Sequence, residues 1–217
     1  MFYRRIAIFL CLLLTFSGLN AQISVDYSLT PTQLVQNVLL GGGISVSNVT
    51  FTGGAEMRGT FEGNSNLGID TGLVLATGDI AVAIGPNSFT SHSDGGGVAG
   101  DSQLDALIGS TTNDAAVLEF DFVPSSDTIR FFYVFGSEEY PEYVCSDFND
   151  VFAFFLSGPN PLGGNYVNEN LAKIPGTNIP VAINSINPGV AGSSGTPGGC
   201  TSLAYSSLYN DNTGGTT

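Results

Sequence analysis

The chain has 217 residues, of which 19 are acidic and 5 are basic, so its formal net charge is −14. A surface of that sign repels nucleic acid and anionic membrane faces, which excludes nucleic acid as a partner. Charged residues make up only 11% of the chain, whereas glycine occurs 29 times and aromatic residues reach 11%. This composition favours β structure with many turns over a disordered chain.

The first residues have the pattern of a secretory signal peptide. Two arginines precede an apolar run over residues 6–16, and the small residue Ala21 stands at the expected cleavage point. The run is too short for a comfortable membrane span. We therefore predict a signal peptide over residues 1–21 and a single exported β domain over residues 22–217. That domain has no membrane span, and its three basic and 19 acidic residues give it a charge of −16.

The first predicted element of the domain is a short helix over residues 30–41. Thr30 is a candidate N-cap, Pro31 fits the first turn, and Gln33 completes a capping box. A strand is predicted next, over residues 44–51, because apolar and polar residues alternate there. The helix is expected to pack at one edge of the β body.

Two short strands are predicted over residues 73–77 and 80–84, because the Gly-Asp pair between them is a hairpin signal. A second short helix is predicted over residues 101–108, with Asp101 as its N-cap. The chain is therefore expected to contain one or two short helices among many strands.

The strongest strand pattern lies in the middle of the chain. Residues 117–123 alternate acidic with apolar side chains, and residues 128–135 form an aromatic run that predicts a strand buried on both faces. Further strands are predicted over residues 151–156 and 179–186. Together these patterns predict a mainly β fold of sandwich-like antiparallel sheets.

Two aromatic-rich runs flank an acidic segment without lysine, arginine or histidine. Such a density of carboxylates is unfavourable unless water, protons or a cation offsets the repulsion, and oxygen ligands of this kind suit calcium. The plainer interpretation is that these acids cap turns and face solvent. The predicted metal ligands are Glu138, Glu139, Glu142, Asp147, Asn149 and Asp150.

The two cysteines of the domain, Cys145 and Cys200, are predicted to form a disulfide, because an even pair in an exported protein is typical of one. Two buried free thiols are the alternative. Tyr140 and Tyr143 lie within the acidic segment and are candidates for stacking on a ligand, whereas the aromatic residues before it are expected in the core.

A glycan hydrolase with paired carboxylates is the alternative function. The candidate pairs are Glu138 with Glu142, and Glu119 with Asp121 on one face of a strand. The only histidine, His92, excludes a histidine-rich zinc site and is interpreted as a polar loop residue.

Three long motifs carry a resemblance to a known family: LEFDFVP at residues 118–124, FYVFGSEEYPEYV at 132–144 and FNDVFAFFLSG at 148–158. The sequence closely resembles the choice-of-anchor L domain. Shorter matching pieces lie at residues 67–78, 114–117, 174–177 and 181–187.

The resemblance implies an exported bacterial module of a large surface or secreted protein, whose anchor varies between lineages. The N-terminal segment resembles signal peptides of Bacteroidetes. Family members continue through further strands, so the chain is expected to be a fragment with closing strands beyond Thr217. We expect a non-catalytic structural or adhesive module, stabilised by calcium, whose partners are carbohydrate or surface proteins.

Overall fold

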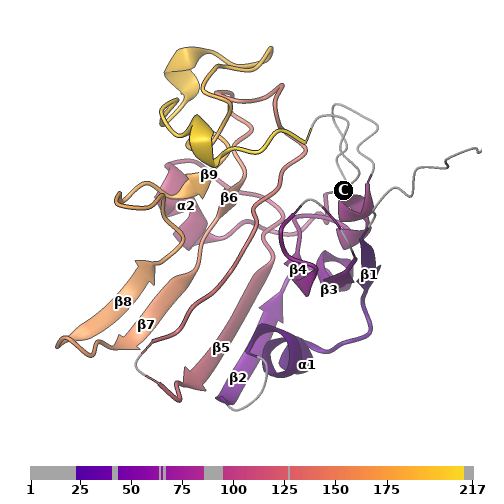
Figure 1. Cartoon of the computed structure of the whole chain (residues 1–217), viewed down its shortest axis with the longest axis vertical. Helices are drawn as coiled ribbons and strands as arrows, with labels where there is room; N and C mark the ends of the chain where they lie inside the picture. Colours follow the sequence, from indigo (N-terminus) through magenta and orange to yellow (C-terminus); the bar gives the residue numbers. More distant parts are fainter. Residues whose placement is uncertain are drawn as a thin grey trace, which may run out of the picture.

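The computed structural model describes residues 23–40, 44–63, 65, 67–85, 95–126 and 128–212. It confirms a mainly β fold of antiparallel sheets with two short α-helices. Figure 1 shows the strands in the lower part of the molecule and a strand-poor region, drawn from salmon to yellow, above them. The predicted signal peptide and His92 lie outside the described residues. None of the described helices is long and apolar enough to span a membrane.

The first helix begins where its capping signals predict. Helix α1 (Pro31–Gln33) continues as the π-helix η1 (Leu34–Leu39). The amide of Gln33 donates to the Thr30 hydroxyl at 3.3 Å, and the amide of Thr30 donates to the Gln33 side chain at 2.9 Å. Leu34 and Val35 are fully buried, so this element anchors its side of the fold through apolar contacts.

One antiparallel sheet has the order β1–β3–β4, formed by Ser24–Asp26, Arg58–Glu62 and Thr71–Leu75, with the 3-10 helix η2 (Ala55–Met57) before β3. The strand predicted over residues 80–84 is wrong, because Ile80–Ile84 form the 3-10 helix η3. The carboxylate of Asp79 accepts a hydrogen bond from the amide of Ala81 at 2.8 Å and caps that helix.

The strands predicted over residues 44–51 and 117–123 are present as β2 (Ser45–Thr52) and β5 (Val117–Val123). They pair with each other in an antiparallel ribbon, whose register shifts between Ser47 and Thr50. Helix α2 (Ser102–Ile108) is also confirmed. Its N-cap Asp101 accepts hydrogen bonds from the amides of the second and third helical residues.

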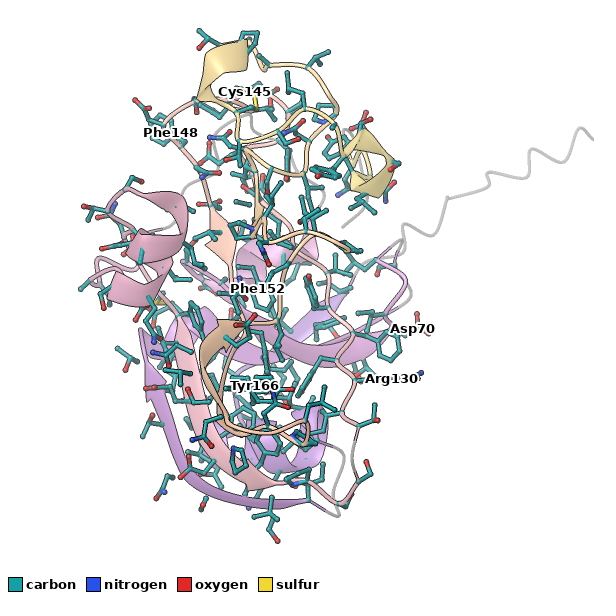
Figure 2. The ribbon with its side chains drawn as sticks, turned by 90° about the vertical axis from the view of Figure 1, so that its left-hand side faces the viewer. Asp70, Arg130, Cys145, Phe148, Phe152 and Tyr166 are labelled. Carbon is teal, nitrogen blue, oxygen red and sulfur yellow. A yellow bond between two sulfur atoms is a disulfide. The ribbon has the colours of Figure 1, made fainter. Side chains whose placement is uncertain are left out.

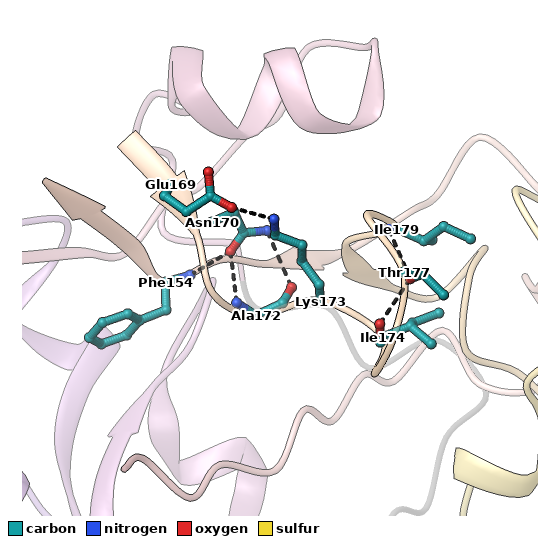
Figure 3. A network of polar contacts seen from close by, with 8 residues as sticks. All are labelled: Phe154, Glu169, Asn170, Ala172, Lys173, Ile174, Thr177 and Ile179. Carbon is teal, nitrogen blue, oxygen red and sulfur yellow. Dashed lines mark hydrogen bonds and ion pairs between the residues drawn. The ribbon is translucent and has the colours of Figure 1, made fainter. Parts of the chain in front are cut away.

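The predicted strand over residues 151–156 divides into β6 (Val151–Phe152) and β7 (Phe155–Pro159). β7 pairs with β8 (Asn165–Asn170), and β6 pairs with β9 (Val181–Ala182), the only part of residues 179–186 that is a strand. Figure 3 shows how the buried Asn170 closes β8: its side chain accepts from the amides of Phe154 and Ala172.

Residues 128–135 do not form the predicted strand. They lie beside β6 and the residue before β7: the Phe131 and Phe154 rings are 4.5 Å apart, and the Tyr133 and Phe152 rings are 4.9 Å apart. Phe132 lies between Phe131 and Tyr133 in the sequence. Because side chains alternate along such a segment, its ring points to the opposite side, where it is 85% exposed. The prediction of burial on both faces is therefore wrong, since only one face of this segment is covered.

Candidate functional site

The acidic segment coils into consecutive turns over residues 138–145. The amide of Tyr143 donates to the carbonyl of Glu139 at 2.9 Å, and the amide of Ser146 donates to the carbonyl of Tyr143 at 3.0 Å. With residues 183–209, which include the 3-10 helices η4 (Pro197–Gly199) and η5 (Ser206–Leu208), residues 137–150 form what we call the cap. The cap is the upper part of the molecule in Figures 1 and 2.

A glycine-rich strap, residues 191–200, lies directly on the backbone of the acidic turns. The amide of Gly192 donates to the carbonyl of Val144 at 2.9 Å, and the amide of Ser194 donates to that of Glu142 at 2.9 Å. A Cβ atom at Gly195 would lie 1.9 Å from the carbonyl oxygen of Val144. The close approach of the two backbones therefore requires glycine at this position of the strap.

The predicted disulfide is present and joins the acidic turns to the end of the strap, Cys145 to Cys200. Beneath it, the buried side chain of Asn184 accepts from the amide of Cys145 at 2.7 Å and donates to the carbonyl of Ser146 at 2.8 Å. The side chain of Asn149, a predicted metal ligand, accepts from the amide of Asn184 at 2.9 Å. The cap is thus held by polar bonds as well as by its cross-link.

Three of the predicted carboxylates influence one another. The Asp150 carboxylate accepts from the Ser137 hydroxyl at 2.7 Å, and one carboxylate oxygen of Glu138 is buried. Burial raises the pKa of Glu139, and the negative charges of Asp150 and Glu138 raise it further. Repulsion between like charges is therefore present at the base of the acidic turns.

The six predicted ligands do not converge on one point. Within the described part of the chain, no group of three or more His, Cys, Asp or Glu side chains is arranged to hold a metal ion. Asp147 is exposed, whereas Asp150 is half-buried and accepts a hydrogen bond from Ser137. Calcium binding by these residues stays a prediction.

The two tyrosines of the acidic turns lie in different surroundings. The hydroxyl of Tyr140 donates to the carbonyl of Ile186, and its ring lies 5.1 Å from that of Tyr209. Burial raises the pKa of Tyr140, and the nearby Tyr209 and Asp150 add to the effect. The ring of Tyr140 is therefore largely committed to contacts within the cap.

The ring of Tyr143 instead pairs with a residue that the sequence analysis did not select. Its centroid lies 5.2 Å from that of Phe148, with the two planes at 74°. Phe148 is 60% exposed and is adjacent in sequence to the exposed Asp147. The signal that could have identified Phe148 is its position among acidic residues, outside either aromatic run.

The carboxylates on β5 point away from the covered side of the ribbon. Asp121 accepts a hydrogen bond from the side chain of Asn48 at 2.6 Å. Glu119 lines a shallow groove that also includes Asp101, but Asp121 does not line it. The pair proposed for glycan hydrolysis is therefore not turned toward one common groove, whereas Glu138 and Glu142 both lie in the acidic turns.

The comparison with protein families gives one match, to the profile of the choice-of-anchor L domain over residues 23–217. No curated protein matches the chain, and no solved structure matches it. The family profile covers all the described strands, the acidic turns and the strap.

Proposed function

This chain belongs to the choice-of-anchor L domain family, and on that premise we propose that it is an adhesive module whose cap contacts carbohydrate. The family identifies a surface-associated, non-catalytic module. The adhesive role and the choice of carbohydrate are our proposal. The observation that carries it is the Tyr143–Phe148 pair next to the exposed Asp147 in the cap.

Phe148 offers an exposed apolar ring, which suits the C–H face of a sugar. Tyr143 meets that ring at 74° and limits its movement. Asp147 is exposed beside it, and an ionised carboxylate accepts hydrogen bonds from sugar hydroxyl groups. A ring for stacking and an acceptor for hydroxyl groups thus lie next to each other on the cap.

The cap supports this role because its backbone is fixed before any ligand arrives. The acidic turns are held by the disulfide, by backbone hydrogen bonds from the strap and by the side chain of Asn184. A preorganised site loses less conformational entropy on binding than a mobile loop does. Small exposed surfaces of this kind bind more tightly when they are presented on a rigid frame.

The proposal is tested by binding to immobilised cellulose, chitin, mannan and starch. Phe148→Ala should weaken binding to the preferred polysaccharide at least tenfold, and Asp147→Asn should weaken it less. Phe132→Ala is the matched control, because Phe132 is more exposed and lies outside the cap. Equal loss in Phe132→Ala and Phe148→Ala, or no binding to any of the four, would contradict the proposal.

We also propose that calcium stabilises the base of the acidic turns. Burial and the charges of Asp150 and Glu138 raise the pKa of Glu139, and a bound cation would offset that repulsion. Calcium should raise the melting temperature, and EDTA should reverse the rise. Glu139→Gln combined with Asp150→Asn should abolish the effect, whereas Asp147→Asn should keep it. An unchanged melting temperature would refute calcium binding.

Export through residues 1–21 completes the proposal. Two arginines, an apolar run and a small residue at position 21 support it. When the full chain is expressed with its leader in a Gram-negative host, the exported protein should begin at Gln22. An N-terminus at Met1 on protein recovered outside the cytoplasm would contradict cleavage.

A further inference from the structure

A shallow groove lies where the end of β2 and the start of β5 meet the chain that enters α2. Its volume is about 210 Å³, and no residue of the cap lines it. Figure 1 locates the three elements that border it, β2, β5 and α2. The residues that line the groove are Thr52, Gly53, Val98, Ala99, Gly100, Asp101, Gln103, Ala115, Val117 and Glu119.

One wall of the groove is held in place by hydrogen bonds. The amide of Asp101 donates to the hydroxyl of Thr112 at 2.9 Å, and the Asp105 carboxylate accepts from that hydroxyl at 2.7 Å. A Cβ atom at Gly100 would lie 2.0 Å from the carbonyl oxygen of Thr112, so the backbone of Gly100 is pressed against that residue. The groove is therefore bordered by fixed backbone as well as by side chains.

The charge of the groove has one sign. Asp101 and Glu119 are its ionisable residues, and no lysine, arginine or histidine lines it. One oxygen of Asp101 accepts from the amides of Gln103 and Leu104. The Glu119 side chain is exposed, and no described residue donates a hydrogen bond to its carboxylate. A carboxylate at a concave, acidic surface attracts cations, and the net charge of −14 strengthens that field.

We propose that this groove binds a small polar molecule that carries a protonated primary amine, of the size of an amino sugar. The ammonium group pairs with Glu119 and with the free oxygen of Asp101. The side chains of Gln103 and Thr52 supply neutral hydrogen-bonding groups for hydroxyls on the same ligand. The small residues Gly53 and Ala99 leave the space for its ring.

The volume suits a ligand with a single ring. At about 30 Å³ for each water molecule, 210 Å³ corresponds to roughly seven waters, which is below the range of drug-sized pockets. The number of carboxylates also favours an ammonium group over a metal ion. Calcium needs six to eight oxygen ligands, while the groove has two acidic side chains, and the described residues hold no metal-binding group of three.

The test is a titration of the protein with glucosamine in mildly acidic buffer, in which the amine is protonated, followed by backbone amide shifts in ¹H–¹⁵N spectra. The amides of Gly100, Asp101 and Val117 should shift together as glucosamine is added. N-acetylglucosamine has nearly the same shape but no positive charge, so it should bind at least tenfold more weakly. Added salt should weaken the binding of glucosamine.

Two substitutions on β5 make a matched pair. Glu119→Gln should weaken glucosamine binding at least tenfold, because it removes the charge that faces the groove. Asp121→Asn removes the same charge two residues further along the same face, outside the groove, and should bind as the wild type does. Equal binding of the acetylated sugar, equal loss in both variants, or the absence of any shift would overturn the proposal.

Discussion

In the cap, aliphatic and polar residues are buried, whereas in residues 128–136, which lead into it, large aromatic residues are exposed. Val144, Cys145 and Ile183 form a buried cluster with the polar Asn184 beside them. Phe132, by contrast, is 85% exposed. Residues 128–136 continue directly into residues 137–150 of the cap, so the difference comes from what lies against each region.

The two regions also differ in how many of their backbone amides and carbonyls form hydrogen bonds. In the cap, the carbonyls of Glu142, Val144 and Cys145 each accept an amide hydrogen of the strap. Within the described residues, the backbone amides of residues 129–136 donate no hydrogen bond, and the contacts of this segment are ring contacts. We therefore expect rigidity in this domain to follow the hydrogen bonding of the backbone more closely than hydrophobic composition.

The largest expected loss of stability follows from removing the disulfide of the cap. Replacing both Cys145 and Cys200 by serine opens a loop with a sequence separation of 55. In the chain-entropy model that costs about 4 kcal/mol. For a domain of this size it lowers the melting temperature by roughly 10 °C. Differential scanning calorimetry measures the change, and wild-type protein treated with reductant should show the same fall. A melting temperature equal to that of untreated wild type would mean that the cap does not need its cross-link.

The strap provides the next test. Gly195→Ala places a methyl group against the carbonyl of Val144 and should destabilise the fold by about 2 kcal/mol. Gly198→Ala, in the same strap, meets no atom within 4 Å and should stay within about 0.5 kcal/mol of wild type. Urea unfolding distinguishes the two. Equal stabilities would show that the close backbone contact is not maintained in solution.

An effect of similar size should separate two phenylalanines in residues 128–136, the segment that leads into the cap. Phe135 packs on the cluster of Val144, Cys145 and Ile183, and its replacement by alanine should cost about 2 kcal/mol. Phe132→Ala removes an exposed ring and should change the unfolding free energy by less than about 0.5 kcal/mol. If Phe132→Ala proved the more destabilising variant, a partner or a further strand would have to cover that ring.

The smallest effect is a pH dependence at the base of the acidic turns. The pKa of Glu139 is raised in the folded protein, by burial first and then by Asp150 and Glu138. The folded state therefore holds this proton more tightly, and stability is lost as pH rises through the folded pKa. Glu139→Gln should raise the melting temperature at neutral pH, and the gain should vanish below the unfolded pKa. Glu62→Gln, at an exposed strand position, is the control, and a pH-independent gain would contradict this cause.

Elements with local signals could be predicted from the sequence. The capping box at Thr30, the N-cap at Asp101 and the alternation of residues 117–123 all act within a few residues. The disulfide was predicted from the number of cysteines and the exported context. The family resemblance was carried by long motifs and is confirmed by the match over residues 23–217.

Features that depend on distant partners could not be predicted in this way. The Gly-Asp pair before Ile80 has a hairpin pattern, but the Asp79 side chain caps a 3-10 helix instead. Whether Phe132 is buried depends on what covers the far side of its segment, which no local pattern reveals. The paths of the turns decide which carboxylates meet, so sequence spacing alone could not tell which members of the acidic cluster lie close together, such as Glu139 with Asp150 and Glu138.

Hydrogen exchange of backbone amides tests the contrast between the two regions most directly. We predict slow exchange at Cys145, Ile183 and Asn184, whose amides donate to buried or half-buried acceptors in the cap. We predict fast exchange throughout residues 129–136. Reduction of the disulfide should remove the protection in the cap and leave the leading segment unchanged. Protection of residues 129–136 equal to that of β5, or rapid exchange in the cross-linked cap, would contradict the account.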